Sequence, residues 1–263
     1  MDLGLKNKVA IVTAASKGLG KASAQALAQE GARIVICSRN KRAIAETASE
    51  LRKATKAHVI SVAADVSKLS DLNMLVATAK RNFGTVHILV NNAGGPPHGD
   101  VLSLPDKEWR NGVDLTLMSA IRLTRLVLPM MISQRWGRVI TITSITAKQP
   151  INELLVSSTL RPGILGLTKV LSNQFAHAEI TINAVCPGYI LTDRQNTLMA
   201  ARALKAQTTV KEYFTDMTKD IPAGRLGRPE EVGHVIAFLA SAQASYVNGA
   251  NLLIDGGLAK GIH

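Results

Sequence analysis

Two turns of small residues have the composition of phosphate-binding loops. The apolar run at residues 9–12 leads into TAASKGLG at residues 13–20, and a helical pattern follows. A tight turn at a helix N-terminus exposes backbone N–H groups at the positive end of the helix dipole, which suits a pyrophosphate. A second turn, NNAGG at residues 91–95, follows a later strand-like run. Parallel sheets bind ligands at the carboxyl ends of their strands, so the two turns predict a dinucleotide site.

The side chains expected near the adenosine ribose favour a phosphorylated dinucleotide. An NAD site has an acid at the end of the second strand, whereas an NADP site has a cation for the 2′-phosphate. Here Ser38 stands at the acid position, Arg39 follows it, and Lys17 lies in the first turn. The alternative is that both bases simply face solvent. We predict NADP(H) as the cofactor.

Strand-like and helix-like segments alternate along the chain, as in a doubly wound fold. Hydrophobic residues make up 46% of the sequence and aromatic residues only 3%, which suits aliphatic parallel strands covered by helices. Predicted strands cover residues 9–13, 33–37, 58–62, 87–90, 138–143, 181–185 and 251–254. Predicted helices cover residues 18–30, 41–54, 69–83, 105–134, 159–176 and 229–240, and Pro129 is expected to end or kink the helix that carries it. We expect one α/β domain over residues 1–263, a Rossmann-type doubly wound parallel sheet of about seven strands.

Residues 190–228 interrupt this alternation and are predicted to be an insertion that covers a site. Within it, residues 197–219 are amphipathic and rich in Ala, Leu, Thr and Met. Such a segment could close over an apolar chain. Its apolar positions could equally pack against the rest of the domain.

Composition and charge exclude several classes of protein. Lys and Arg number 31 and Asp and Glu 19, a formal charge of +12, but the bases are scattered and do not form the stripe of a nucleic-acid binder. No apolar run is as long as a membrane span. Cys37 and Cys186 lack metal-ligand spacing and are predicted to be buried thiols in a reducing compartment, so no metal site is expected. We expect a cytoplasmic protein with no nucleic-acid or membrane partner.

The chain resembles the short-chain dehydrogenase/reductase family over its whole length, and 3-oxoacyl-acyl-carrier-protein reductases within it. The likeness rests on TAASKGLG (13–20), ADV (64–66), NNAG (91–94), Ser144, the Pro187-Gly188 pair with Thr192, and LIDGG (253–257). It implies a homotetramer with helices 105–134 and 159–176 and the C-terminal segment at its interfaces. It also implies the cofactor-binding residues Thr13, Ala15, Ser16, Lys17, Gly18, Leu19, Gly20, Ser38, Arg39, Asp65, Val66, Asn92, Ala93, Gly94, Arg161, Pro187, Gly188, Ile190 and Thr192.

One departure from the family lies in the first turn. Ala14 stands where the family usually has glycine. If the position requires a positive φ, alanine costs roughly 1–2 kcal/mol there. The loop would then sit slightly differently, and binding of the dinucleotide would still be possible.

A second departure affects the catalytic residues. The family uses a tyrosine four residues before a lysine, with a serine and an asparagine. None of the three tyrosines, at positions 189, 213 and 246, is followed at that distance by lysine. Counting 13 residues forward from Ser144, or 30 back from Pro187, gives Ser157 at the tyrosine position, and Arg161 stands at the lysine position. Thr116, 21 residues before Gly137, stands at the asparagine position.

These replacements change the acid–base chemistry that the site can perform. A serine hydroxyl is a far weaker acid than a tyrosine phenol, and arginine keeps a fixed charge that can hold ribose hydroxyls or an oxyanion. We predict that Ser157 and Arg161 form an anion-binding pair in the space that the phenol ring would fill. Other proton donors considered are His98, Tyr189 and a water held by Ser144, Ser157 and Arg161.

Three functions remain open on the sequence. The first is an NADP(H)-dependent oxidoreductase that acts on a carbonyl, acyl-thioester or alcohol substrate with Ser144, Ser157, Arg161 and Thr116 as its catalytic set. The second is a nucleotide-binding protein without turnover, acting as a sensor or subunit partner. The third is an α/β domain whose loops bind another ligand. The intact Ser144 favours the enzyme, although a serine there could also cap a turn.

Overall fold

One parallel sheet of seven strands forms the centre of the molecule, which is a computed structural model describing residues 1–261. The strand order is β3-β2-β1-β4-β5-β6-β7, and every neighbouring pair is parallel. The strands are β1 (Val9–Val12), β2 (Arg33–Ser38), β3 (Val59–Ala63), β4 (Ile88–Asn91), β5 (Gly137–Ile142), β6 (Ile180–Pro187) and β7 (Asn251–Ile254). The predicted fold class is confirmed. The order reverses between β1 and β4, which places the loops after these two strands side by side.

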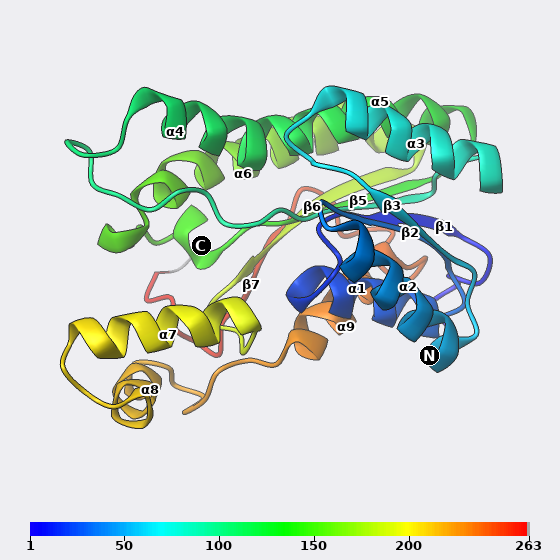
Figure 1. The fold of residues 1–263 in the computed structure, drawn as a ribbon. Coiled ribbons are helices and arrows are strands. Elements are labelled where there is room, and N and C mark those ends of the chain that lie inside the picture. Colours follow the sequence, from blue (N-terminus) through cyan, green and yellow to red (C-terminus); the bar gives the residue numbers. More distant parts are fainter. Residues whose placement is uncertain (262–263) are drawn as a thin grey trace.

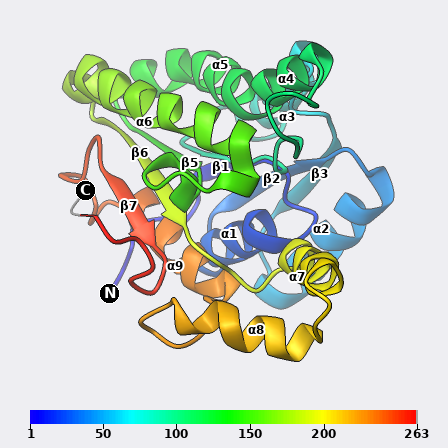
Figure 2. The same ribbon diagram turned by 90° about the vertical axis from the view of Figure 1, so that its left-hand side faces the viewer.

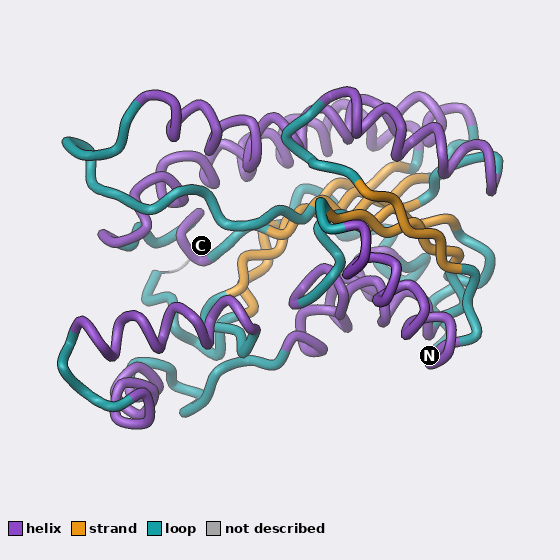
Figure 3. The backbone as a smooth tube through the Cα atoms, viewed as in Figure 1, coloured by secondary structure: helices purple, strands orange, loops and turns teal. Residues whose placement is uncertain are grey.

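Helices cover both faces of the sheet (Figures 1 and 3). The upper layer in Figure 1 holds α3 (Leu69–Phe83), α4 (Asp106–Gly112), α5 (Ser119–Ser133) and α6 (Leu155–Phe175). Below the sheet lie α1 (Gly18–Gln29), α2 (Lys41–Thr55) and α9 (Pro229–Ala240). Two further helices, α7 (Asp193–Lys205) and α8 (Val210–Lys219), project beyond the end of the sheet (Figures 1 and 2).

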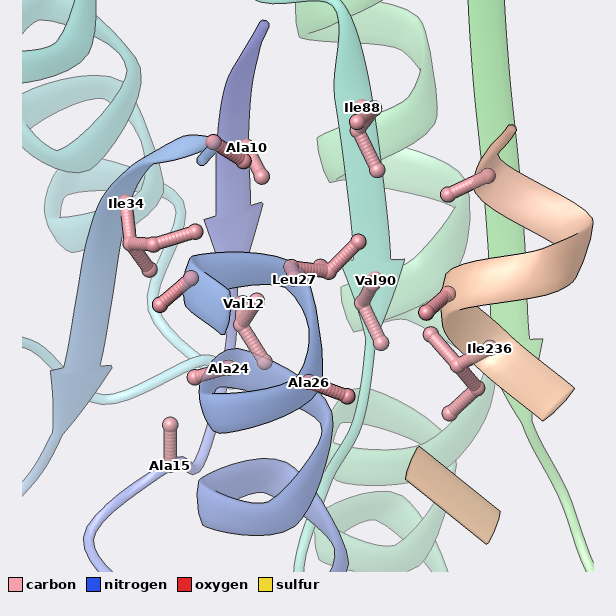
Figure 4. Close-up of a cluster of buried hydrophobic side chains, with 14 of the residues drawn as sticks. Ala10, Val12, Ala15, Ala24, Ala26, Leu27, Ile34, Ile88, Val90 and Ile236 are labelled. Atoms are coloured by element: carbon pink, nitrogen blue, oxygen red, sulfur yellow. The ribbon is translucent and has the colours of Figure 1, made fainter. Parts of the chain in front are cut away.

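The strands are apolar on both sides because each side meets a helical layer. In β1, Ala10 and Val12 belong to the hydrophobic cluster on the α1 and α9 side, and Ile11 belongs to the opposite cluster. Figure 4 shows Val12, Val90 and Ile236 meeting side chains of α1 in the first cluster. Helices α1 and α9 pack closely, since a Cβ on Gly233 would lie 2.7 Å from the carbonyl oxygen of Ala22.

The region predicted as one helix over residues 105–134 consists of three parts. A π-helical segment, Val113–Met118, joins α4 to α5. The backbone hydrogen bonds of a π-helix span five residues and not four, and the hydrophobic pattern of the sequence does not reveal this change. Helix α5 also continues past Pro129 to Ser133, so this proline does not end the helix. Helix α6 begins at Leu155, earlier than the predicted start at residue 159.

Helices α7 and α8 lie within the predicted insertion at residues 190–228. Their apolar side chains form a small cluster of their own around Met199, Ile221 and Leu226. Tyr213 and Phe214 of α8 pack against this cluster and not against the main core. The amphipathic pattern therefore comes partly from packing between the two helices and the adjoining loop.

Two helical stretches, Asp106–Ser133 and Asn152–Ala178, are long and apolar enough to cross a membrane by length and composition alone. In this structure both run along one face of the sheet (Figure 1). Side chains of α5 such as Leu123 and Val127 are buried against the strands. Core helices of a globular domain have the same composition.

Candidate active site

A cavity of about 930 Å³ opens at the carboxyl ends of the strands. Its walls come from the loops after β1 to β6 and from the first turns of α7. At one end lie the small residues of the first turn and the residues after β2 and β3. Toward β5 and β6 lie Ser144, Ser157 and Arg161, and the beginning of α7 borders the cavity between the two ends.

The first turn and the NNAGG turn are tied together by hydrogen bonds. The Thr13 hydroxyl donates to the carbonyl oxygen of Asn92 (2.7 Å) and accepts from the Asn92 N–H (2.8 Å). The Asn92 amide nitrogen also donates to the carbonyl oxygen of Ala14 (3.3 Å). A Cβ on Gly20 would lie only 2.6 Å from that same carbonyl oxygen. The cavity lining does not include Thr13, Ala15 or Gly20. These residues belong to the first turn, whose other residues do line the cavity.

The N-terminus of α1 faces this cavity without a side-chain cap and without an acidic residue in its first turn. Gly18 has a φ of +57°, and the Cβ that it lacks would lie 3.5 Å from Thr192 Cγ2. The loop after β6 therefore lies directly beside the first turn. Ala14 has a φ of +47°, so the position does require the left-handed region, as the family comparison implied.

Lys17, Ser38 and Arg39 line the same end of the cavity, as the cofactor argument requires. Asp65 also lines it, so one carboxylate is present there. Burial opposes ionisation of Asp65, but hydrogen bonds from Ser67 and the charge of Arg39 lower its pKa. The Asp65 carboxylate therefore accepts its hydrogen bonds from Ser67, and the positive charge of Arg39 offsets its negative charge.

Ser144 and Ser157 are brought together at the other end by Thr146. The hydroxyl oxygens of Thr146 and Ser157 lie 2.8 Å apart, and both residues are buried. The Ser144 oxygen accepts a hydrogen bond from the Thr146 N–H (3.2 Å), so this serine does cap a short helical turn. Its hydroxyl hydrogen remains available to a ligand. Thr116 does not line the cavity, and its buried hydroxyl has no hydrogen-bond partner within residues 1–261.

Arg161 is buried beside these hydroxyl groups without a carboxylate partner. Its side chain is 9% exposed, and its one hydrogen bond among the described residues is a long one (3.5 Å) to the Ile142 carbonyl oxygen. The Nε atom has no partner in the described part of the chain. Burial, with the nearby charge of Arg194, lowers the pKa of Arg161 to about 10. The guanidinium remains charged at neutral pH.

Sequence reasoning missed two arginines that α7 contributes to the cavity, Arg194 and Arg202. Arg194 packs on Gly95, where any side chain would collide with its guanidinium group. Its Nη2 donates to His98 Nε2 (3.2 Å), because a guanidinium has no acceptor. The available signal was the position of Arg194, two residues after Thr192 in the first turn of a helix.

The two cysteines are free and buried in β2 and β6, as predicted. Burial raises the pKa of Cys37 to about 12 and raises that of Cys186 as well. Neither is a reactive thiolate at neutral pH. Within residues 1–261 no three His, Cys, Asp or Glu residues are grouped so that they could hold a metal ion.

Known proteins are similar to this chain over nearly its whole length, with about one third of the residues identical. A family model described as enoyl-(acyl carrier protein) reductase matches residues 13–259. The 3-oxoacyl-acyl-carrier-protein reductase FabG of Staphylococcus epidermidis is 32% identical over 252 residues, which are 96% of this chain and 99% of that protein. Dehydrogenase/reductase SDR family member 4 of Bos taurus is 33% identical over 254 residues, 96% of this chain and 88% of that protein.

A solved structure agrees over the full length. L-sorbose reductase from Gluconobacter frateurii, in complex with NADPH and L-sorbose, superposes with a TM-score of 0.96 and 30% identity and covers 100% of both chains. The family match spans nearly all of the residues that form the sheet and the cavity. The chain belongs to the short-chain dehydrogenase/reductase family and is an oxidoreductase of that family.

Proposed function

We propose that the protein transfers a hydride between NADP(H) and a carbonyl or alcohol substrate, with Ser157 and Arg161 in place of the family's tyrosine and lysine. One observation carries the proposal. A single cavity is lined at one end by the turn at the N-terminus of α1 and at the other by Ser144, Ser157 and Arg161. A dinucleotide lying along this cavity would bring its nicotinamide end to the three side chains.

The residues at the first end fit NADP(H). The uncapped N-terminus of α1 suits a pyrophosphate, and Lys17 and Arg39 supply positive charge for a 2′-phosphate. The L-sorbose reductase that shares this fold binds NADPH. The bound cofactor would supply or accept the hydride. The lining residues that would hold it are Ser16, Lys17, Gly18, Leu19, Ser38, Arg39, Asp65, Val66, Asn92, Ala93, Gly94, Arg161, Pro187, Gly188, Ile190 and Thr192.

Ser144 and Arg161 would stabilise the negative charge that develops on the substrate oxygen. The Ser144 oxygen already accepts from the Thr146 backbone, so its hydroxyl hydrogen can be donated to the carbonyl oxygen. Arg161 adds a fixed positive charge at a buried position, where charge interactions are stronger than in water. Neither role requires either side chain to lose a proton.

The proton that accompanies hydride transfer would come from a water molecule held between Ser144, Ser157 and Arg161. Two other donors are less well suited. Burial raises the pKa of the Tyr189 phenol despite the charge of Arg202, which makes it a weaker acid. His98 accepts at Nε2 from Arg194, so this nitrogen carries no proton to give. A missing general acid typically costs ~10²–10⁴ in rate, so we expect slow turnover.

Calorimetry followed by turnover assays tests this function. NADPH should bind wild-type protein more tightly than NADH, and Arg39→Ala should reduce that difference; equal affinities throughout would refute the cofactor assignment. Ketones and 3-oxoacyl thioesters should then oxidise NADPH in the presence of wild type, and more slowly with Ser144→Ala and Arg161→Ala. Tight NADPH binding without any turnover would establish instead a nucleotide-binding protein that is not an enzyme.

Three further expectations belong to this proposal. The first is assembly into a homotetramer, which is supported by exposed apolar side chains on α6, α9 and β7, namely Val170, Phe238 and Leu252. The second is a cytoplasmic location. Helices α7 and α8 would cover the substrate, because the first turns of α7 line the cavity. Light scattering of the purified protein tests the assembly, and a monomer at micromolar concentration would contradict it.

A further inference from the structure

Three arginine side chains line the cavity near its substrate end, and none of them is paired with a carboxylate among residues 1–261. These are Arg161 from α6 and Arg194 and Arg202 from α7. Asp193 is the carboxylate that lines this end, and it lies beyond ion-pair distance of all three guanidinium groups.

This arrangement does not stabilise the empty protein. Arg161 is buried with an unpartnered Nε, and the charge of Arg194 acts on it as a like charge. An unpaired buried charge is costly, and a second cation nearby adds to the cost. A bound anion would relieve both effects.

Arg194 is positioned to meet such an anion. It reaches from α7 across to the loop after β4, where its guanidinium packs on Gly95 and donates one hydrogen bond to His98. Its other N–H groups have no protein acceptor among the described residues, although the side chain lines the cavity. A guanidinium with free N–H groups matches the two oxygens of a carboxylate or phosphate.

Resting on the function proposed above, we infer that the substrate is a small carbonyl compound bearing a carboxylate or phosphate group that pairs with Arg194. Its carbonyl oxygen would face Ser144 and Arg161. Arg161 and Arg194 line the same cavity, so one small molecule could place its carbonyl oxygen at Arg161 and its anionic group at Arg194. The cavity must also accommodate the dinucleotide, which limits the remaining space to a small molecule.

Matched substrate pairs test the inference by turnover. Acetoacetate would be compared with its methyl ester, and dihydroxyacetone phosphate with dihydroxyacetone. We expect wild type to favour at least one charged member by about tenfold or more in kcat/KM, the equivalent of about 1.4 kcal/mol. Whichever pair shows the preference identifies the carboxylate or the phosphate as the recognised group. Equal kcat/KM values for charged and neutral members of both pairs would overturn the inference.

Two variants and one binding measurement separate this inference from the proposed function. Arg194→Gln should remove the preference for the charged member, so that kcat/KM for the charged and neutral members of each pair agrees within about twofold. Lys205→Gln, on the same helix but outside the cavity, should keep the preference. Calorimetry of acetoacetate and dihydroxyacetone phosphate on the protein with bound NADP⁺ needs no turnover. Binding that Arg194→Gln weakens about tenfold supports the inference even in an inactive protein, and binding unaffected by that change refutes it.

Discussion

The hydroxyl oxygens of Thr146 and Ser157 lie 2.8 Å apart in the buried wall of the cavity. Thr146 is fully buried, so removing its partner leaves a polar group without compensation. We expect Ser157→Ala to lower the free energy of unfolding by about 1–3 kcal/mol. Ser157→Ala combined with Thr146→Val should cost less than the sum of the two single changes, because no orphaned hydroxyl remains. Urea denaturation of the four proteins measures this coupling, and strict additivity would argue against the pair.

Restoring the family's tyrosine at position 157 and its lysine at position 161 should accelerate catalysis. Ser157→Tyr with Arg161→Lys introduces an acid whose pKa a nearby ammonium can lower. We expect kcat to rise by about tenfold or more. The matched control is Ser157→Phe with Arg161→Lys, which adds the ring without the hydroxyl. If the tyrosine and phenylalanine variants are equally active, the phenol is not the missing acid.

Ala14 adopts a backbone conformation that glycine tolerates better. Its φ of +47° lies in the left-handed region, where a Cβ costs roughly 1–2 kcal/mol. Part of the gain is offset by the greater entropy of glycine in the unfolded chain. Ala14→Gly should therefore stabilise the protein by about 0.5–1 kcal/mol and raise Tm by a few degrees. Ala15→Gly, at a buried neighbour without a positive φ, should destabilise it.

The identity of residue 38 should decide between the two dinucleotides. Ser38 lines the cavity beside Arg39, and a carboxylate there would repel a 2′-phosphate. We expect Ser38→Asp to weaken NADPH binding by about tenfold to a hundredfold while NADH binding stays level or improves. Ser38→Asn, which adds similar volume without charge, controls for crowding. Equal losses in both variants would attribute the effect to size.

His87 should make the protein less stable in mild acid. Burial, with the charge of Lys8, lowers its pKa from 6.5 to about 4, and its Nδ1 accepts a hydrogen bond from the Val9 N–H. The unfolded chain binds the proton near pH 6.5, whereas the folded protein binds it only near pH 4. The stabilisation is complete above pH 6.5 and is lost as the pH falls toward 4.

A substitution isolates that contribution. His87→Asn keeps a hydrogen-bond acceptor for Val9 and removes the titrating group. Its free energy of unfolding, measured by urea denaturation, should fall less than that of wild type between pH 6.5 and 4. Parallel pH profiles of the two proteins would assign the acid sensitivity to other groups.

Local sequence was sufficient to predict the sheet and the two small-residue turns at its carboxyl edge. The five central strands β1, β2, β4, β5 and β6 are buried on both faces, so their apolar runs are easily recognised in the sequence. The turns after β1 and β4 are rich in small residues, which let the two loops pack closely. The π-helical segment Val113–Met118 was not predictable, because one widened turn leaves the hydrophobic pattern almost unchanged.

The substrate end depends on relationships that spacing does not encode. The sequence located Ser157 and Arg161 by counting, yet it gave no sign that Thr146 would contact the serine. Arg194 and Gly95 are distant in the chain and meet only because α7 folds back toward the loop after β4. Exposed-looking arginines in a helix are usually solvated, so their convergence emerges only in three dimensions.

The small cluster around Met199, Ile221 and Leu226 has an evolutionary consequence. It anchors α7 and α8 separately from the large clusters that hold the strands and the first turn. Descendants of this protein can therefore exchange residues of α7 that face the cavity while the clusters that hold the strands and the first turn remain intact. Selection for a new substrate would act at little risk to the scaffold on the α7 side chains that line the cavity, which are Asp193, Arg194, Gln195, Thr197, Leu198 and Arg202.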